Sequence, residues 1–258
     1  MALPIDPKMI PIERGWDVLP VFSVNDFHPS YLSTLREIDS DPEVAGHSDV
    51  GVRNLLFTLI LSIRPEAVLE VGGHIGSAAL VMGEGLRLNG FGKLHTLEPQ
   101  QHYFKRLTYY IERAALRDIV IPINGSSDDL ETRQKLASLA PFEVIFIDAC
   151  HDYSAVLDDI IYCSSLIAEH GFIVLHDSSI YAQSFDKRKE GGVRRAILEC
   201  CRKSAELQAI FFEFPLWVNN CGAAILCKQA ILERSKKKNL LQFLFPFKEA
   251  GGTRDSSV

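Results

Sequence analysis

The chain has 258 residues, of which 47% are hydrophobic, and its formal net charge is −6. This length and composition allow one large core, so we expect one main domain with additions. No broad basic region accompanies the negative charge, which argues against a nucleic-acid substrate because phosphate contacts need clustered Lys and Arg.

The first residues, the longest apolar stretch and the cysteines indicate the cellular location. The first residues, Met-Ala-Leu-Pro-Ile-Asp-Pro-Lys, lack the pattern of a secretory leader, and the apolar stretch 55–63 is too short to span a bilayer. The six cysteines form no Cys-x-x-Cys pair and predict reduced, mostly buried thiols. We expect a soluble cytoplasmic protein that acts on a small molecule.

The chain divides into three predicted parts. Six prolines among the first 50 residues predict an irregular arm or cap over residues 1–50. The main domain is expected at 51–228, followed by a tail at 229–258. The apolar residues 240–247 of the tail predict packing on the chain itself or on a second subunit, with a membrane-surface anchor as the alternative. We therefore expect a homo-oligomer.

In the main domain, apolar runs alternate with segments of helical period, as in βαβ units. Strands are predicted at 67–71, 93–97, 119–123, 143–147 and 171–175. Helices are predicted near 51–63, 76–89, 100–115, 127–139, 153–168 and 192–205. Two last runs, 208–214 and 221–227, predict an antiparallel hairpin through a turn at Asn219-Asn220. The fold class is therefore α/β, Rossmann-like, with a mainly parallel sheet of seven strands that ends in this hairpin.

Residues 68–76 read Val-Leu-Glu-Val-Gly-Gly-His-Ile-Gly, which predicts a strand, a tight turn and the start of a helix. Glycines at 72, 73 and 76 let a ligand approach the backbone, and the helix start favours an anionic group or a nucleoside. The dinucleotide fingerprint Gly-x-Gly-x-x-Gly is broken by His74. Glu70 before Gly72 instead resembles motif I of the class I S-adenosylmethionine-dependent methyltransferases.

Two later segments would complete such a cofactor site. Glu98 follows the 93–97 strand and could accept hydrogen bonds from a ribose diol, although an acid before Pro99 could also simply cap a helix. The turn 124–129 resembles the adenine-binding segment of catechol O-methyltransferases, which implies Ser127 and Asp128 beside the base; Ser126 or Ser127 could equally be a helix N-cap. The residues expected to bind S-adenosylmethionine are Glu70, Gly72, Gly73, His74, Gly76, Glu98, Ser127, Asp128 and Asp148.

The strongest catalytic pattern is Asp148 and His151 at the end of the 143–147 strand. An imidazole near neutral pH can take a proton from an attacking hydroxyl, so His151 is the candidate general base; a positioning residue or a structural loop histidine is the alternative. At the same spacing, the catechol family has a metal-binding aspartate and a catalytic lysine, and macrolide-sugar O-methyltransferases use histidine.

Asp177, after the 171–175 strand, corresponds in that resemblance to the second metal aspartate. The next position carries Ser178 where the family has asparagine, so a Mg²⁺ site on Asp148 and Asp177 is left open. In the alternative, Asp177 caps the following loop and His176 packs against the sheet edge. The three predicted catalytic residues are His151, Asp148 and Asp177.

The resemblance covers about 50–228 and includes bacterial sugar and macrolide tailoring enzymes. It implies methyl transfer from S-adenosylmethionine to a hydroxyl of a small molecule such as a sugar or secondary metabolite. The cephamycin hydroxylase proteins also resemble this family, so hydroxylation or another chemistry is one alternative, and a non-catalytic cofactor-binding partner protein is another. The loop 178–191 could be a substrate lid or a solvated loop.

Overall fold

A computed structural model describes residues 24–42, 48–204, 207–213 and 221–228. The predicted tail at 229–258, the Asn219-Asn220 turn and the first 23 residues of the predicted arm lie outside these ranges. In the described part, no helix is both long enough and apolar enough to cross a membrane. The six cysteines are all free thiols, and only Cys150 is exposed.

One seven-stranded sheet forms the centre of the molecule, in the order β3-β2-β1-β4-β5-β7-β6. The strands are β1 (Ala67–Val71), β2 (Lys93–Leu97), β3 (Val120–Ile123), β4 (Phe142–Ile147), β5 (Ile167–His176), β6 (Leu207–Phe212) and β7 (Ala223–Lys228). The first five pair in parallel, whereas β7 runs antiparallel to both β5 and β6. The predicted α/β sheet with a closing antiparallel hairpin is confirmed.

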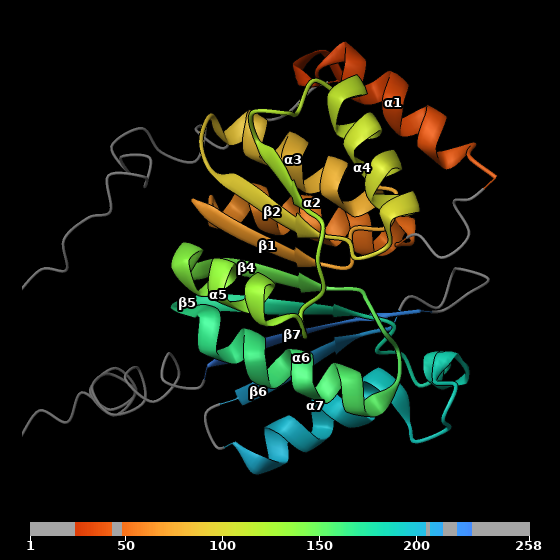
Figure 1. The fold of residues 1–258 in the computed structure, drawn as a ribbon, viewed down its shortest axis with the longest axis vertical. Coiled ribbons are helices and arrows are strands. Elements are labelled where there is room, and N and C mark those ends of the chain that lie inside the picture. The colour runs from red at the N-terminus through yellow and green to blue at the C-terminus, as the bar shows by residue number, and fades with distance from the viewer. Residues whose placement is uncertain (1–23, 43–47, 205–206, 214–220, 229–258) are drawn as a thin grey trace, which may run out of the picture.

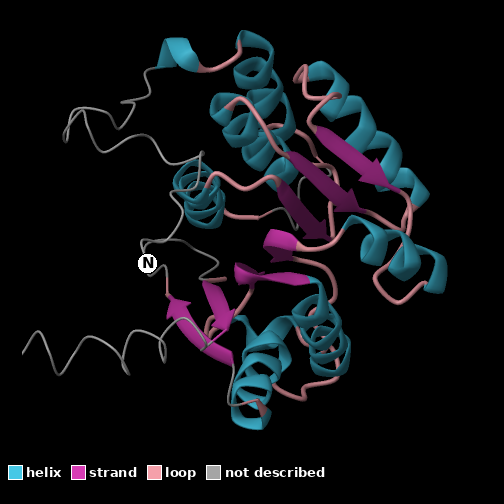
Figure 2. Cartoon of the chain, turned by 90° about the vertical axis from the view of Figure 1, so that its left-hand side faces the viewer, coloured by secondary structure: helices cyan, strands magenta, loops and turns pink. Residues whose placement is uncertain are grey.

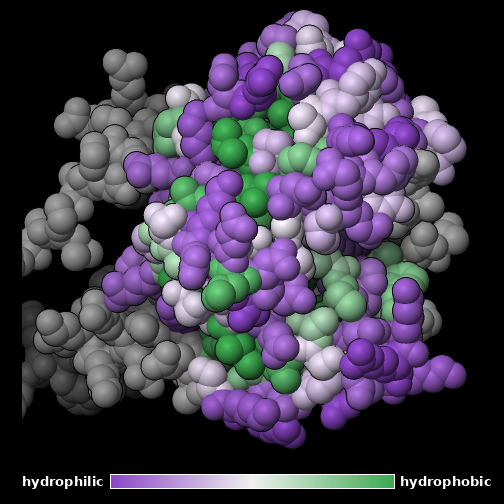
Figure 3. All heavy atoms as spheres, viewed as in Figure 1, coloured by the Kyte–Doolittle hydropathy of each residue, from purple (hydrophilic) through white to green (hydrophobic). Residues whose placement is uncertain are grey.

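Helices cover both faces of this sheet (Figures 1 and 2). They are α1 (Pro29–Asp39), α2 (Val50–Ile63), α3 (Ser77–Asn89), α4 (Gln101–Arg113), α5 (Leu130–Leu139), α6 (Tyr153–Leu166) and α7 (Gly192–Lys203). One buried apolar cluster packs α1–α4 on one face, and a second packs α5–α7 on the other. The outer surface seen in Figure 3 is mostly hydrophilic, as expected when the apolar side of each helix faces the sheet.

Strand alternation decides which functional side chains meet. In β5, Val174 belongs to the α1–α4 cluster, whereas Ile173 and Leu175 belong to the α5–α7 cluster. Because successive residues of a strand point to opposite faces, His176 points to the same face as Val174. The N-terminus of α2 lies on that face, and this brings residues from before the main domain next to the end of β5.

Two of the predicted element boundaries differ most from the structure. Residues 29–39 form α1, although six prolines predicted an irregular arm: Pro29 is the first residue of the helix, where its missing N–H costs nothing. Strand β5 begins at Ile167 rather than at 171, because it continues through the exposed residues Glu169 and His170, which interrupt the apolar run.

Candidate active site

A cavity of about 650 Å³ opens at the carboxyl ends of β1, β2 and β4. The order of the strands reverses between β1 and β4, and such a switch point is where open parallel sheets bind ligands. The lining includes the predicted residues Gly72, His74, Glu98, Ser127, Asp128, Asp148 and His151. One continuous space therefore joins the predicted cofactor residues to the predicted base.

The turn after β1 forms the first wall of this cavity. Gly72 has φ +99°, and a Cβ atom there would lie 2.2 Å from the carbonyl oxygen of Asp148, so no larger residue fits. The N–H groups of Gly72 and Gly73 both donate to the carbonyl of Leu97, which ties the turn to the end of β2. His74 has φ +46°, and its ring lies 4.2 Å from that of Tyr103 in α4.

Glu98 lines the cavity and is itself buried. Its carboxylate accepts the N–H of His74 at 2.8 Å and the N–H of Gln100 at 2.8 Å. Burial raises the pKa of this carboxyl, while the two N–H groups oppose the change. Helix α4 starts at Gln101 with Gln100 as its N-cap, so Glu98 is not the helix cap that the alternative supposed; it holds the glycine turn instead.

Three predicted cofactor residues do not line the cavity. Glu70 is 1% exposed within β1, and burial raises the pKa of its carboxyl to about 8. A Cβ atom on Gly73 would lie 2.4 Å from the hydroxyl oxygen of Thr96, and one on Gly76 would lie 2.9 Å from the side chain of Leu107. These residues shape the turn from behind and do not contact the space in front of it.

The turn after β3 forms the opposite wall. Helix α5 begins at Leu130 with Asp129 at its N-cap, so the alternative that Ser126 or Ser127 caps the helix is wrong. The reason is local: the carboxylate of Asp129 accepts the N–H of Ser126 and closes a turn that delays the helix. The hydroxyl of Ser127 donates to Asp159 at 2.5 Å, and Ser126, Ser127 and Asp128 all face the cavity.

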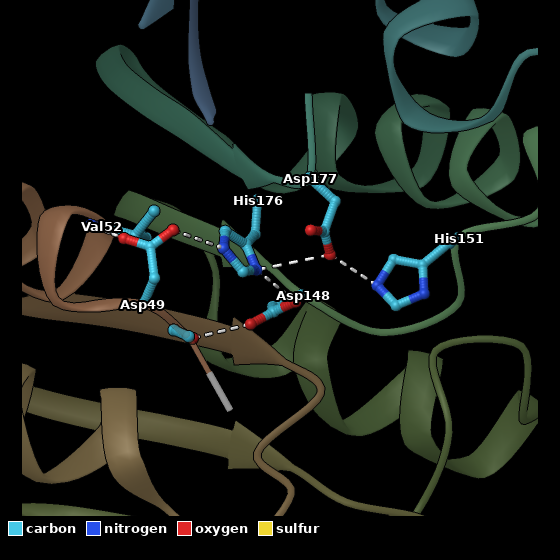
Figure 4. A network of polar contacts seen from close by, with 7 residues as sticks. Asp49, Val52, Asp148, His151, His176 and Asp177 are labelled. Carbon is cyan, nitrogen blue, oxygen red and sulfur yellow. Dashed lines mark hydrogen bonds and ion pairs between the residues drawn. The ribbon is translucent and has the colours of Figure 1, made fainter. Parts of the chain in front are cut away.

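The three predicted catalytic residues lie together beyond β4 and β5 (Figure 4). His151 Nε2 lies 2.7 Å from Asp177 Oδ2, and hydrogen bonding to this carboxylate raises the pKa of His151 although burial opposes it. Asp177 has φ +53°, a left-handed conformation that turns its side chain toward His151. His151 is in the cavity lining, whereas Asp177 stands behind it.

Asp148 is held by two residues that were not assigned to the site from the sequence. Ser48 donates to Asp148 Oδ2 at 2.7 Å, and His176 Nδ1 lies 3.1 Å from Asp148 Oδ1. The other ring nitrogen of His176 lies 3.4 Å from Asp49, the N-cap of α2. His176 therefore does not pack at a sheet edge, because β5 lies between β4 and β7 and the ring points inward from it. In the sequence, Asp49 could have been found only as an acid that stands just before the predicted helix at 51–63.

The loop 178–191 contains a short 3₁₀ helix, Ala182–Phe185. Asp186 is buried, and its carboxylate accepts the N–H groups of Arg188, Glu190 and Gly192. The ring of Phe185 lies 5.8 Å from that of His151, so part of this loop lies beside His151. Residues 180, 181 and 187–190 are exposed, and the roles of a substrate lid and of a solvated loop both stay predictions.

Known proteins that resemble the chain agree with this geometry. Residues 69–178 match the sequence model of a family described as a methyltransferase domain. The matched segment runs from β1 through Ser178, and so contains the glycine turn, Glu98, Asp148, His151 and Asp177. A search of curated proteins finds no match by sequence.

Solved structures show that the fold is that of the class I methyltransferases. An O-methyltransferase from Bacillus cereus in complex with S-adenosylhomocysteine superposes with a TM-score of 0.66 at 20% identity, covering 81% of this chain and 92% of that one. A putative O-methyltransferase from Klebsiella pneumoniae gives 0.65 at 18% identity, covering 82% and 92%. The tomaymycin-synthesis O-methyltransferase of Streptomyces achromogenes, in complex with S-adenosylmethionine, gives 0.63 at 18%, covering 78% and 90%. The predicted methyltransferase fold is confirmed.

Proposed function

We propose that this protein transfers a methyl group from S-adenosylmethionine to a hydroxyl of a small molecule. The observation that carries the proposal is the single cavity that joins Gly72 and Glu98 at one end to His151 at the other. The solved neighbours named above, with S-adenosylmethionine or its product bound, support the choice of cofactor. A sugar or secondary metabolite remains the expected class of acceptor.

The residues of the cofactor end fit an adenosine group. Glu98 is a buried carboxylate that faces the cavity, and each of its oxygens keeps a lone pair beyond the backbone N–H it accepts. This suits the two hydroxyls of a ribose. Ser127 and Asp128 would lie at the base, and Gly72 and His74 along the rest of the ligand. S-adenosylmethionine supplies an activated methyl group on a sulfonium.

His151 is the proposed general base. Asp177 accepts the proton on Nε2, which fixes the neutral tautomer in which Nδ1 is free to take a proton. The same hydrogen bond raises the pKa of His151 and so strengthens it as a base. As the acceptor hydroxyl attacks the methyl carbon, its proton would pass to Nδ1, and Asp177 would stabilise the imidazolium that forms.

A Mg²⁺ site on Asp148 and Asp177 stays a prediction, and this mechanism assigns it no step. The oxygens of Asp148 contact Ser48 and His176, and one oxygen of Asp177 contacts His151, so an ion here would have to share these oxygens with protein groups. Ser178 stands where an asparagine carbonyl would be a ligand. The distances permit an ion, since Asp148, His151 and Asp177 offer ligand atoms within 4.8 Å of one another.

The proposal is tested by measuring formation of S-adenosylhomocysteine with a panel of sugars, phenols and aliphatic alcohols. Product formation that depends on both the acceptor and His151 supports it. Calorimetric binding of S-adenosylmethionine without turnover of any acceptor would favour the non-catalytic alternative. Conversion of an acceptor with no methyl gain, detected by mass spectrometry, would favour a different chemistry such as hydroxylation.

A further inference from the structure

Arg133 of α5 lines the cavity beside Ser127 and Asp128, at the end proposed for the base. Its Nε donates to the carbonyl of Ser127 at 2.6 Å. The guanidinium carbon lies 4.6 Å from the centroid of the Tyr162 ring in α6, and the hydroxyl of Tyr162 donates to the carbonyl of Arg133 at 3.0 Å. Stacking on the ring and the hydrogen bond from Nε together fix the plane of the guanidinium.

The outer part of this guanidinium is unused within the described residues. An arginine has five N–H donors, and four of them are on the two Nη atoms. No described residue accepts a hydrogen bond from either Nη of Arg133, and no described carboxylate forms an ion pair with it. Because the half-buried side chain lines the cavity, these donors are available to a bound ligand.

The charges around Arg133 favour a neutral ligand group over an anion. Burial raises the pKa of Asp159, and the hydroxyl of Ser127 and the charge of Arg133 oppose this change. A hydrogen bond from Ser126 and, more weakly, the charge of Arg133 lower the pKa of Asp128. These two acidic groups offset part of the positive charge, so a ligand group at this point has to accept hydrogen bonds but does not have to be negative.

The groups beside Arg133 are hydrogen-bond acceptors. The hydroxyl of Ser127 donates its proton to Asp159 at 2.5 Å, so only its lone pairs remain for a ligand. The carboxylate of Asp128 also accepts. This wall therefore places donors from Arg133 next to acceptors from the turn. Adenine has the matching pattern, since its amino group donates and the ring nitrogen beside it accepts.

We propose that Arg133 recognises the base of the cofactor by donating from its Nη atoms to a ring nitrogen of adenine. These donors suit a nitrogen beside the amino group that Asp128 is expected to accept. Nε meanwhile holds the carbonyl of Ser127, so one side chain both contacts the base and fixes the turn next to it. The assignment rests on the proposed function, because it takes S-adenosylmethionine as the ligand.

Calorimetry without an acceptor tests this contact, so methyl transfer does not enter the measurement. The ligands are S-adenosylhomocysteine and its three deaza analogues, in which N1, N3 or N7 of the base is replaced by C–H. The proteins are wild type, Arg133→Ala, Arg133→Gln and the control Lys135→Ala, which removes an exposed cation from the same helix.

Wild type and the Lys135→Ala control should bind one analogue about tenfold or more weakly than S-adenosylhomocysteine, the usual size of a hydrogen bond to a charged group. Arg133→Ala should bind S-adenosylhomocysteine about as weakly as wild type binds that analogue, and should no longer distinguish the two ligands. Arg133→Gln keeps more of the side chain and should show the same loss of discrimination.

Two results would overturn the proposal. One is an equal loss for S-adenosylhomocysteine and all three analogues in a folded Arg133 variant, which would mean that Arg133 only supports the turn. The other is a wild type that binds every analogue as tightly as S-adenosylhomocysteine. In both cases the cofactor still binds, so the proposed function stands. A wild type that binds neither S-adenosylmethionine nor S-adenosylhomocysteine refutes the proposed function, and this contact with it.

If thermal melts show that neither Arg133 variant folds, proton exchange at the guanidinium groups of the wild type decides. By NMR, exchange at one arginine should slow when S-adenosylhomocysteine binds and stay fast with the analogue that binds weakly. Exchange that is equally slow with both ligands, or slow with neither, rejects the contact.

Discussion

The two ends of the cavity are built in different ways. The proposed cofactor end uses short stretches directly after β1, β2 and β3, each positioned by its own turn and by hydrogen bonds to a neighbouring turn. The proposed acceptor end brings together Ser48 and Asp49, Asp148 and His151, and His176 and Asp177, which are up to 129 positions apart in the chain. The first end depends on local backbone geometry, and the second on side-chain charges that meet only in the folded sheet.

This difference predicts how each end responds to substitution. At the cofactor end, backbone groups do much of the work, so losing one side chain should weaken binding without abolishing it. At the acceptor end, charged groups constrain one another in a space with little water, so removing one should change the rate and its pH dependence. The following variants separate the two ends.

The largest effect is expected from His151→Ala at the acceptor end. Turnover should fall by about 10²- to 10⁴-fold, the usual contribution of a general base, while the affinity for S-adenosylmethionine stays nearly constant. Initial rates with an aliphatic alcohol or a sugar, together with calorimetry, measure the two quantities. His170→Ala, an exposed histidine of β5, is the matched control. A loss of less than about fivefold would show that the acceptor ionises without His151.

Glu98→Ala should have the opposite effect to His151→Ala: it should weaken binding of S-adenosylmethionine more than it lowers turnover. Loss of a charge-assisted contact costs about 1.5–3 kcal/mol, so the dissociation constant for S-adenosylmethionine should rise roughly 10- to 150-fold, with a smaller change in turnover at saturation. Calorimetry measures it, and a thermal melt checks that the turn at His74 still folds. Glu131→Ala, on the exposed side of α5, is the control. Unchanged affinity in a folded Glu98→Ala protein would remove Glu98 from the cofactor site.

The same contrast explains what could be predicted from the sequence. Strands β1 and β2 were predicted with their observed limits because each is a short run, clearly apolar in β1 and weaker in β2, that ends just before a glycine or proline turn. Glu98, Asp148 and His151 follow such runs directly, so a rule about strand ends finds them. The start of β5 at Ile167 was missed because the exposed Glu169 and His170 lie inside the strand.

Residues contributed from outside the βα units were not predictable in this way. Asp49 carries the pattern of a helix N-cap, and nothing local shows that its second oxygen faces His176. Cys221 precedes β7, and only the insertion of β7 beside β5 brings it near that ring. For His176, packing against the sheet edge was the alternative drawn from the sequence, since the sequence does not reveal that three carboxylates converge on it. Contacts between charged residues far apart in the chain depend on the order of the strands in the sheet, which these local patterns do not give.

Substitution of Glu70 tests the buried carboxyl that lies behind the glycine turn. Its folded pKa of about 8 lies above the unfolded value, so the folded state binds the extra proton and stability falls as pH rises from about 4.5 to about 8. Glu70→Gln, a neutral residue of the same shape, should remove this loss. Urea unfolding at about pH 5 and pH 7 should show the variant gaining about 2 kcal/mol relative to wild type between the two conditions. An equal pH dependence in both proteins would mean that the carboxyl is ionised in the fold.

The smallest expected effect is a shift in the pH profile, and it isolates one contact at the acceptor end. The hydrogen bond that His151 donates to Asp177 raises the pKa of His151, and a base works only in its deprotonated form, so activity should rise with pH through a midpoint above the ordinary histidine value. Asp177→Asn removes the negative charge, which lowers the pKa of His151 and moves the acid limb of kcat/KM to lower pH.

The shift of the pH midpoint is more informative than the rate of Asp177→Asn. A structural defect would by itself lower the rate, so a lower rate does not show that the charge was lost. A general loss of fold would reduce activity at every pH and leave the midpoint in place, whereas loss of the charge moves the midpoint. Asp118→Asn, an exposed aspartate far along the chain, controls for the change in net charge. The midpoint could instead stay fixed in Asp177→Asn and shift in His176→Asn. The acid limb would then follow the titration of His176, the buried ring beside Asp148, and the general base would have to be sought there.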